Sequence, residues 1–301
     1  MDTEQVSVEE KVFLVTGATD GIGRETARAL AEMGGQVVVH GRNATKTAQT
    51  VAAIKAETGN GAVSSLLADF ASLGAVWEMA TGFRKQHGRL DVLVNNAGAM
   101  FISRQETADG FEKTFQVNHL APFLLTNLLL DTLQQTATVA GEARVVNVSS
   151  DAHQGKQLDF DDLQNRRSYR GMDAYGQSKL ANLYFTYELA RRLAGTAITA
   201  NALHPGFVAT NIGADNFPLL GGLVRRVINL FTPRDAVKGA ETSIYLATSP
   251  AVRGVTGKYF VDCKPVPSSP ASRDEAAAER LWARSAEMVG LDKNENGFSS
   301  P

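Results

Sequence analysis

Tyr175 and Lys179 stand four residues apart, a spacing that places two side chains on one face of a helix, about one turn from each other. A phenol with a pKa of about 10 transfers protons poorly at neutral pH. A neighbouring ammonium favours the phenolate, so we expect Lys179 to lower the pKa of Tyr175 toward the working range of an enzyme. The pair predicts acid–base chemistry by Tyr175; the alternative is a pair on a surface helix.

Other polar residues that suit this chemistry precede the pair. The apolar run VVNV ends at Ser149 and Ser150, where a hydroxyl can donate to a substrate oxygen and stabilise negative charge developing on it. Ser150 is the preferred candidate and Ser149 the alternative. Asn118 lies in an apolar stretch, where a buried amide must find partners. Pro122 disturbs helical hydrogen bonding nearby, which leaves backbone groups for a water.

A glycine-rich turn follows the first strand-like run. Gly17, Gly21 and Gly23 follow the spacing G-x-x-x-G-x-G and lead directly into a helical segment. Glycine lets the backbone approach a phosphate closely, and a helix N-terminus offers unpaired N–H groups and the positive end of its dipole. In this strand–turn–helix context the turn predicts nucleotide binding; the alternative is a purely structural turn.

The end of the second strand-like run indicates which nucleotide is bound. An NAD-selective site has an acidic residue here that accepts hydrogen bonds from the ribose 2′-hydroxyl, but this chain has Gly41 and Arg42. A guanidinium forms charge-assisted hydrogen bonds with a 2′-phosphate, which favours NADP(H) over NAD(H). Asp69, after the third run, is expected to accept from the adenine amino group, or alternatively to cap the following helix.

Strand-like and helical segments alternate along the chain. The strand-like runs are residues 12–16, 36–40, 63–68, 90–95, 144–149, 198–203 and 257–261, and the helical segments between them are 22–33, 45–58, 73–87, 111–136 and 173–194. This alternation predicts an α/β fold: a single Rossmann-type doubly wound domain with a mostly parallel seven-stranded sheet and helices on both faces. The strands are apolar almost throughout, as expected when both faces are buried.

The expected organisation is one catalytic domain with two extensions. Residues 1–10 form a polar N-terminal extension, and residues 11–263 the Rossmann-fold domain with a substrate lobe at 207–232. Residues 264–301 form a C-terminal extension, with a Pro- and Ser-rich surface segment at 264–272 and one amphipathic helix at 276–288. Nothing in the composition marks a second domain.

Composition narrows the class of protein. The chain has 301 residues, 44% of them hydrophobic, which suffices for a real core. Its net charge of −2 gives no general attraction to nucleic acid. No apolar run is long enough for a membrane span, and the first residues do not resemble a signal peptide. The one cysteine cannot form an internal disulfide or a cysteine metal cage, so we expect a cytoplasmic protein with no metal site.

These motifs occur in a family order. TGxxxGIG at 16–23, NNAG at 95–98, Asn118, Ser150, YxxxK at 175–179 and Pro205-Gly206 together resemble the short-chain dehydrogenase/reductase family over about residues 10–262. The resemblance implies a catalytic tetrad of Asn118, Ser150, Tyr175 and Lys179, with Asn118 holding a proton-relay water. The residues expected to bind NADP(H) are Gly17, Thr19, Asp20, Gly21, Ile22, Gly23, Arg42, Asp69, Phe70, Asn96, Ala97, Gly98, Tyr175, Lys179, Pro205, Val208 and Thr210.

Three further segments narrow the resemblance. The long loop 151–172, SKLAN at 178–182 and HPGFVAT at 204–210 are similar to the branch that holds retinol dehydrogenases and WW-domain-containing oxidoreductases, although the chain shows neither a membrane anchor nor a WW module. The branch implies carbonyl/alcohol interconversion on a hydrophobic aldehyde, ketone or retinoid-like substrate, and the family implies a homodimer through helices 111–136 and 173–194. His153 is either a substrate contact or a solvated loop residue. The alternative functions are reduction of a conjugated C=C bond, or NADP(H) binding by a regulator without turnover.

Overall fold

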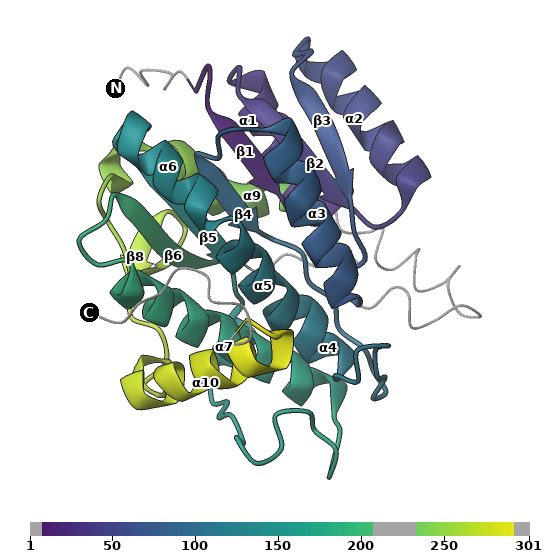
Figure 1. Cartoon of the computed structure of the whole chain (residues 1–301), viewed down its shortest axis with the longest axis vertical. Helices are drawn as coiled ribbons and strands as arrows, with labels where there is room; N and C mark the ends of the chain where they lie inside the picture. Colours follow the sequence, from purple (N-terminus) through teal and green to yellow (C-terminus); the bar gives the residue numbers. More distant parts are fainter. Residues whose placement is uncertain (1–7, 207–232, 292–301) are drawn as a thin grey trace.

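A computed structural model of the chain describes residues 8–206 and 233–291, which form an α/β fold around one twisted sheet (Figure 1). The strands are β1 (Val12–Val15), β2 (Gln36–Gly41), β3 (Val63–Leu67), β4 (Val92–Asn95), β5 (Ala143–Val148), β6 (Ile198–His204), β7 (Tyr259–Val261) and β8 (Lys264–Val266). Their order is β3-β2-β1-β4-β5-β6-β7-β8, and every neighbouring pair is parallel except β7 and β8. The order reverses between β1 and β4, the place where sheets of this kind bind ligands.

Helices cover both faces of the sheet. They are α1 (Gly21–Glu32), α2 (Ala44–Thr58), α3 (Leu73–Gln86), α4 (Lys113–Phe115), α5 (Ala121–Leu128), α6 (Leu130–Ala140), α7 (Gly171–Arg192), α9 (Pro233–Thr248) and α10 (Glu275–Val289). In β1 and β2, alternate residues belong to two different buried clusters: Leu14 and Val38 pack toward α3, α5 and α7, whereas Phe13 and Val37 pack toward α1 and α9. The predicted doubly wound fold is confirmed, because each strand buries side chains on both faces.

The sheet has one strand more than we predicted. Residues 264–266, expected to lie in an extended surface segment, form β8 antiparallel to β7. The chain reverses at Asp262 and Cys263, whose φ angles are 47° and 60°. Positive φ at both central residues is the geometry of a type I′ hairpin turn, which matches the twist of the strands that it joins. The sequence gives little sign of this turn because it contains no glycine or asparagine.

Two helical segments also differ from the prediction. The expected helix at 111–136 is divided into α4, a π-helical turn at Gln116–Leu120, α5 and α6. Pro122 follows the π-helical turn and has no N–H to donate to the carbonyl of Asn118. The helix α9, which we did not predict, connects β6 toward β7 and packs against α1. A crossover helix is what a parallel strand pair of this kind requires.

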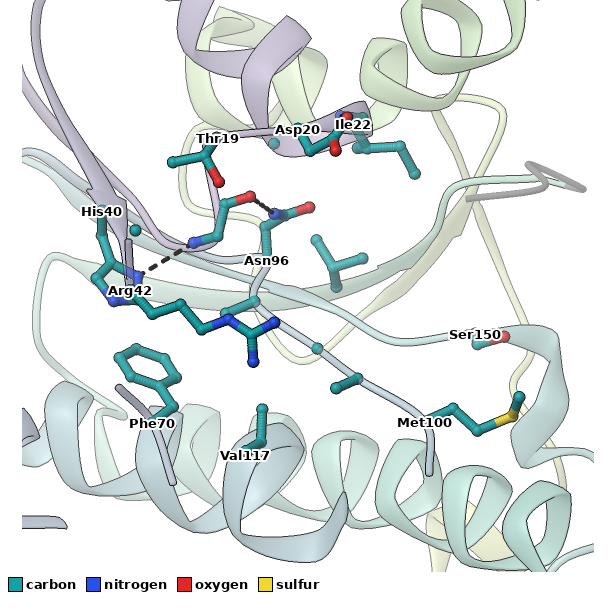
Figure 2. Close-up of a pocket in the computed structure, with 18 of the residues that line it drawn as sticks. Thr19, Asp20, Ile22, His40, Arg42, Phe70, Asn96, Met100, Val117 and Ser150 are labelled. Carbon is teal, nitrogen blue, oxygen red and sulfur yellow. Dashed lines mark hydrogen bonds between the residues drawn. The ribbon is translucent and has the colours of Figure 1, made fainter. Parts of the chain in front are cut away.

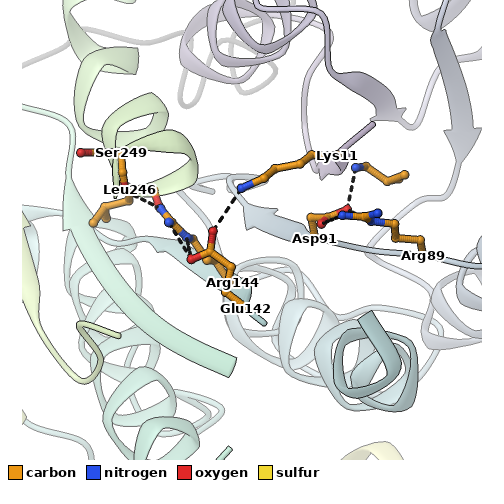
Figure 3. Close-up of polar contacts among 8 residues, drawn as sticks. Lys11, Arg89, Asp91, Glu142, Arg144, Leu246 and Ser249 are labelled. Carbon is orange, nitrogen blue, oxygen red and sulfur yellow. Dashed lines mark hydrogen bonds and ion pairs between the residues drawn. The ribbon is translucent and has the colours of Figure 1, made fainter. Parts of the chain in front are cut away.

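At the edge of the sheet where the strands begin, charged side chains bind backbone groups of neighbouring elements (Figure 3). Arg144, which is buried, donates from Nη1 to the carbonyls of Leu246 (3.0 Å) and Ser249 (2.9 Å) and pairs through Nη2 with Glu142 (2.9 Å). The carboxylate of Asp91 accepts from the backbone N–H of Val12 at 2.8 Å. These contacts join β5 to the end of α9, and β1 to the residue before β4, away from the carboxyl edge.

The C-terminal helix α10 packs across α7 and reaches α5 and the π-helical turn (Figure 1). Trp282 lies edge-on to Phe123 of α5 at 4.9 Å between ring centroids and contacts Phe185 of α7 at 5.9 Å. α10 therefore occupies part of the surface through which we expected two subunits to pair. The homodimer stays a prediction. Within residues 8–206 and 233–291, no helix has the length and apolar character needed to cross a membrane.

Candidate active site

One pocket, with a volume of about 800 Å³, lies at the carboxyl edge of the sheet where the strand order reverses (Figure 2). The predicted site residues that line it are Gly17, Thr19, Asp20, Gly21, Ile22, Gly23, Arg42, Asp69, Phe70, Asn96, Ala97, Gly98, Ser150, Tyr175, Lys179 and Pro205. Val208 and Thr210 lie outside the described residues, as does the expected substrate lobe at 207–232. Residues more than 100 positions apart therefore meet in one cavity.

The glycine-rich turn forms one wall of the pocket, and its glycines are required by packing. Gly17 has a φ of +62°, and a Cβ there would lie 2.8 Å from the Cα of Ala97. A Cβ on Gly23 would lie 2.3 Å from Nδ2 of Asn96 and 2.5 Å from the carbonyl oxygen of Gly17. Asp20 is the N-cap of α1 and accepts from the N–H of Gly21 at 2.8 Å. The turn thus brings bare backbone and a helix N-terminus to the pocket, the arrangement that binds phosphate groups.

Asn96 and Thr16 hold the glycine-rich turn in place through hydrogen bonds. The Asn96 amide donates to the carbonyls of Thr16 (2.8 Å) and Gly17 (3.2 Å), the second of which is drawn in Figure 2. The Thr16 hydroxyl accepts from the backbone N–H of both Asn96 and Ala97, each at 3.0 Å. Asn96, predicted as a cofactor contact, therefore also braces the loop. Sequence reasoning missed Thr16, although a hydroxyl at the end of a buried strand needs partners.

Positive charge gathers where β2 ends. Arg42 is exposed and extends into the pocket between Asn96 and Val117 in the view of Figure 2. Lys46, which sequence reasoning missed, also lines the pocket and pairs with Asp20 at 2.8 Å across its rim. A Cβ on Gly41 would lie 2.3 Å from the Thr47 hydroxyl, so a side chain there would displace the start of α2. Two cations thus follow the end of β2, the position at which an NAD-selective site has a carboxylate.

Asp69 faces the same end of the pocket, after β3. One carboxylate oxygen accepts from the backbone N–H of Ala71 at 2.9 Å, which closes a local turn. The N-cap of α3 is Ser72, whose hydroxyl accepts from Ala75 at 3.3 Å. The alternative that Asp69 caps the helix is therefore wrong, and its side chain lines the pocket beside Phe70.

The two adjacent serines after β5 have different partners. The Ser149 hydroxyl, which is buried, donates to the carbonyl of Lys179 at 2.8 Å. The Ser150 hydroxyl accepts from the backbone N–H of Ala152 at 3.2 Å, so its own proton is not used by that bond. The Ser150 side chain also acts on Tyr175, whose pKa it lowers. Ser150 is therefore the hydroxyl available to a ligand in the pocket, as preferred from the sequence.

Tyr175 and Lys179 lie on the same face of α7, as their spacing predicts, with Nζ of Lys179 5.5 Å from the centroid of the Tyr175 ring. Burial raises the pKa of Tyr175 above its usual value, and the Ser150 side chain opposes this shift. We expected Lys179 to lower the Tyr175 pKa, but in this structure the pKa is raised, and burial is the main cause. Burial also lowers the pKa of Lys179 to about 8. Lys179 donates to the carbonyl of Val148 at 3.0 Å.

Asn118 lies in the π-helical turn and is fully buried. Its Oδ1 accepts from the N–H of Ala99 at 2.7 Å, and its Nδ2 donates to the carbonyl of Ala99 and the hydroxyl of Ser178, both at 2.9 Å. The side chain is therefore fully engaged with the protein. A Cβ on Gly98 would lie 3.3 Å from Nζ of Lys179 and 3.5 Å from Oδ1 of Asn118. The Lys179 ammonium and the Asn118 amide oxygen therefore both lie close to Gly98.

The profile of the short chain dehydrogenase family matches residues 11–218, more than half of the chain and the whole of the predicted tetrad. The chain belongs to the short-chain dehydrogenase family. Among its relatives, human retinol dehydrogenase 14 is 42% identical over 297 residues, covering 94% of this chain and 87% of its own. Mouse retinol dehydrogenase 12 is 41% identical, and the match covers 96% of this chain and 89% of the relative. Human polyprenol dehydrogenase is also 41% identical, and the match covers 94% of this chain and 86% of the relative. The predicted retinol dehydrogenase-like branch is thus confirmed.

Solved structures agree with the family fold. An uncharacterized protein from Mycobacterium paratuberculosis superposes with a TM-score of 0.77 at 34% identity, covering 95% of this chain and 96% of its own. A Pseudomonas aeruginosa protein, solved as the RhlG/NADP active-site complex, has a TM-score of 0.67 at 26% identity and 86% and 97% coverage. These matches support the assignment of this short-chain dehydrogenase to a Rossmann-like fold.

Both expectations for His153 are wrong. The residue is fully buried at the start of loop 151–172, where it neither contacts the pocket nor faces solvent. Its Nε2 accepts from the backbone N–H of Ser269 at 3.2 Å, so Nδ1 carries the proton and donates to the carbonyl of Ser150 at 2.7 Å. The ring thus links the main chain of Ser150 to the C-terminal extension. The sequence could not predict this contact because the partners are 116 residues apart.

Some apolar residues that were not predicted also line the pocket. They are Met100, Phe101 and Val117; Figure 2 shows Met100 on the side of Ser150 and Val117 near Arg42 and Phe70. Lys46 and these three residues carry no motif that distinguishes them from ordinary loop or core residues, whereas Thr16 begins the glycine-rich motif but was given no role of its own. Among the described residues, no group of three or more His, Cys, Asp or Glu side chains is arranged to hold a metal ion.

Proposed function

We propose that this short-chain dehydrogenase is an NADP(H)-dependent oxidoreductase that interconverts a carbonyl and an alcohol on a hydrophobic substrate. The observation that carries the proposal is the shared pocket: the glycine-rich turn and Arg42 lie at one end, and Ser150, Tyr175 and Lys179 at the other. One ligand can therefore contact a phosphate-binding turn and an acid–base pair at the same time.

The residues present fit a phosphorylated dinucleotide. The turn has no room for a Cβ at Gly17 or Gly23, which leaves its backbone bare toward the pocket. Residues 21–23 would hold the pyrophosphate, and Asp69 would bind the adenine. Arg42 and Lys46 would bind the 2′-phosphate, and Lys179 would bind the ribose next to the nicotinamide. When bound, the dinucleotide supplies or accepts the hydride.

The chain's own side chains supply the proton. In carbonyl reduction, Ser150 and Tyr175 donate hydrogen bonds to the carbonyl oxygen, which polarises the carbon toward hydride attack. Because burial keeps the phenol protonated at neutral pH, Tyr175 holds the proton that the new alkoxide takes. Alcohol oxidation is the reverse of these steps. The Asn118 side chain is fully engaged, so any relay water there would bind the Asn118 carbonyl, for which Pro122 provides no N–H.

The substrate class is inferred from apolar residues in the pocket and from the relatives. Met100, which lies on the side of Ser150 in Figure 2, and Phe101 offer hydrophobic surface in the pocket. Relatives at 41–42% identity are named for retinol and polyprenol, both long apolar alcohols. We therefore expect a hydrophobic alcohol or aldehyde of retinoid or isoprenoid type.

A turnover assay with matched variants tests the proposal. The purified chain is given NADPH with all-trans-retinal or a long-chain enal, and products are separated by chromatography. We expect the allylic alcohol, and a loss of about 10²–10⁴-fold in kcat for Tyr175→Phe, the usual size of a general-acid effect. Tyr184→Phe is the control, because this tyrosine lies on the same helix and its hydroxyl bonds the Ala271 carbonyl instead.

Two outcomes would contradict the proposal. A saturated aldehyde from the enal would indicate reduction of the conjugated C=C bond. Tight NADPH binding with no product from any carbonyl compound would indicate a regulator without turnover. The cytoplasmic location expected from the sequence stays a prediction beside this proposal.

A further inference from the structure

His40 occupies an unusual place for a histidine, at the carboxyl end of a buried parallel strand. The residue is only 3% exposed and stands next to the last residue of β2, two positions before Arg42. Its ring borders the pocket, as Figure 2 shows. Neither the family motifs nor the acid–base chemistry described above gives this side chain a role.

Both ring nitrogens of His40 bind backbone groups of neighbouring segments. Nδ1 lies 3.1 Å from the backbone nitrogen of Gly17, the first glycine of the turn (Figure 2). Nε2 lies 3.1 Å from the carbonyl oxygen of Ala68, just after β3. Because the Gly17 N–H can only donate and the Ala68 carbonyl can only accept, the proton must reside on Nε2 and the ring must be neutral. Burial agrees with this, since it lowers the pKa of His40 to about 4.

The same residue makes two further contacts with the ends of these strands. Its ring stacks on Phe70, with 4.4 Å between centroids and 18° between planes. Its carbonyl accepts from the N–H of Ala18 at 2.9 Å. His40 therefore connects three segments of the pocket wall: the glycine-rich turn after β1, the end of β2, and residues 68–70 after β3.

We propose that His40 is a positioning residue of the nucleotide site, which fixes Gly17 and Phe70 relative to each other before a dinucleotide binds. This inference rests on the proposed function for the identity of the ligand. The segments that it holds surround the adenosine and pyrophosphate, which NADPH and NADH share. Loss of His40 should therefore weaken the binding of both nucleotides by the same factor, whereas loss of Arg42 should change their ratio.

Three substitutions separate the two hydrogen bonds from the stacking. His40→Phe keeps a flat ring against Phe70 but leaves the Gly17 N–H and the Ala68 carbonyl without partners. In His40→Asn the amide oxygen takes the place of Nδ1 and accepts from Gly17. In His40→Gln the amide nitrogen takes the place of Nε2 and donates to Ala68. If the bond to Gly17 positions the turn, the Asn variant should bind nucleotide better than the Phe and Gln variants.

The experiment is a fluorescence titration of each variant with NADPH and with NADH, beside hydrogen exchange of the Gly17 amide without nucleotide. For His40→Phe we expect affinities about 10-fold or more weaker for both nucleotides, an unchanged NADPH/NADH ratio, and faster exchange at Gly17. For His40→Asn, which keeps the bond to Gly17 but loses the stacking on Phe70, we expect affinities between those of wild type and His40→Phe. If His40→Phe does not fold, the comparison of the other two variants tests the proposal: His40→Asn should bind both nucleotides more tightly than His40→Gln does.

Wild-type affinity in both the Phe and Gln variants would overturn the role of His40 while leaving the proposed function intact. So would a shift in the NADPH/NADH ratio with no common loss. If the wild-type chain binds neither nucleotide, the proposed function fails instead, and unchanged Gly17 exchange in His40→Phe would then overturn the positioning role independently.

Discussion

At the residue scale, the acid–base pair is shaped by burial more than by mutual attraction. Tyr175 and Lys179 are both buried, and burial disfavours the charged form of each, raising the pKa of the phenol and lowering that of the ammonium to about 8. In the proposed mechanism, reduction needs a protonated Tyr175, and a cationic Lys179 beside it stabilises the negative charge that proton transfer leaves on the phenol oxygen. The Lys179 pKa therefore sets the alkaline limit of the reaction.

This limit is measurable as a pH profile. As pH rises through about 8, Lys179 loses its proton, so we expect kcat/KM for carbonyl reduction to fall about 10-fold per pH unit above that value. An ordinary lysine would keep its charge to a pKa of about 10.4. Lys179→Arg, whatever its absolute rate, should show no decline near pH 8 because a guanidinium stays charged. A wild-type profile that is flat to pH 10 would contradict the shifted pKa.

The residues that sequence reasoning found are those whose roles depend on local spacing. Tyr175 and Lys179, and the glycines at 17, 21 and 23, act within one or two turns of chain, so their types and intervals reveal them. The buried histidines depend on distant partners instead. His153 binds Ser269, which is 116 residues away, and His119 binds Ser285, which is 166 residues away. A local sequence pattern cannot predict contacts over such separations.

At the element scale, the end of α9 is held by a buried charge. Arg144 on β5 donates to the carbonyls of Leu246, in the last turn of α9, and of Ser249, the residue after the helix (Figure 3). Backbone acceptors at a helix C-terminus lack helical partners, and the dipole there favours a cation. Glu142 neutralises the guanidinium from the other side. The interaction connects an element that we did not predict to the sheet.

We expect Arg144→Ala to lower the free energy of unfolding by about 3–5 kcal/mol, because it leaves the Glu142 carboxylate and two carbonyls without their main partner. Urea denaturation followed by circular dichroism measures the change. Arg284→Ala is the matched control, since the Arg284–Glu287 pair is largely exposed and should contribute less than about 1 kcal/mol. Equal small effects in the two variants would show that Arg144 does not anchor α9.

Regular elements were predictable from the sequence where their apolar pattern is continuous, as in β1, β2 and β5. The exceptions have physical causes. The predicted helix at 111–136 is interrupted because Pro122 cannot complete regular hydrogen bonding, and the resulting π-helical turn carries Asn118. The strand β8 depends on a turn with positive φ at Asp262 and Cys263. Aspartate is common in such turns, but cysteine is not, so the pair gives only a weak turn signal.

At the scale of the whole molecule, the C-terminal extension packs on helices of the predicted catalytic domain. Its helix α10 covers α7, and Trp282 packs on Phe123, Phe185 and the guanidinium of Arg192. Through Ser285 it also bonds His119, the neighbour of Asn118, at 2.8 Å. The domain boundary that we placed at residue 263 therefore separates segments that share one core.

Trp282→Ala should lower the free energy of unfolding by about 3–5 kcal/mol, the usual cost of removing a large buried aromatic side chain. Trp282→Phe, which keeps an aromatic contact with Phe123, should cost clearly less. Thermal and urea unfolding measure both. A negligible effect of Trp282→Ala would mean that α10 is not docked on α7 in solution, and would leave the surface predicted for a homodimer accessible.

The most direct test of an NADP(H)-dependent enzyme compares the affinities of the protein for NADPH and for NADH. Fluorescence titration measures both in the wild-type chain, in Arg42→Ala and in the control Arg28→Ala. Arg28 pairs with Glu25 and Glu32, outside the pocket. We predict that wild type and Arg28→Ala bind NADPH at least about 10-fold more tightly than NADH, and that Arg42→Ala has lost this preference. The reason is that charge-assisted hydrogen bonds to a 2′-phosphate contribute roughly 1.5–3 kcal/mol. Equal affinities in wild type, unchanged by Arg42→Ala, would contradict an NADP(H)-dependent enzyme.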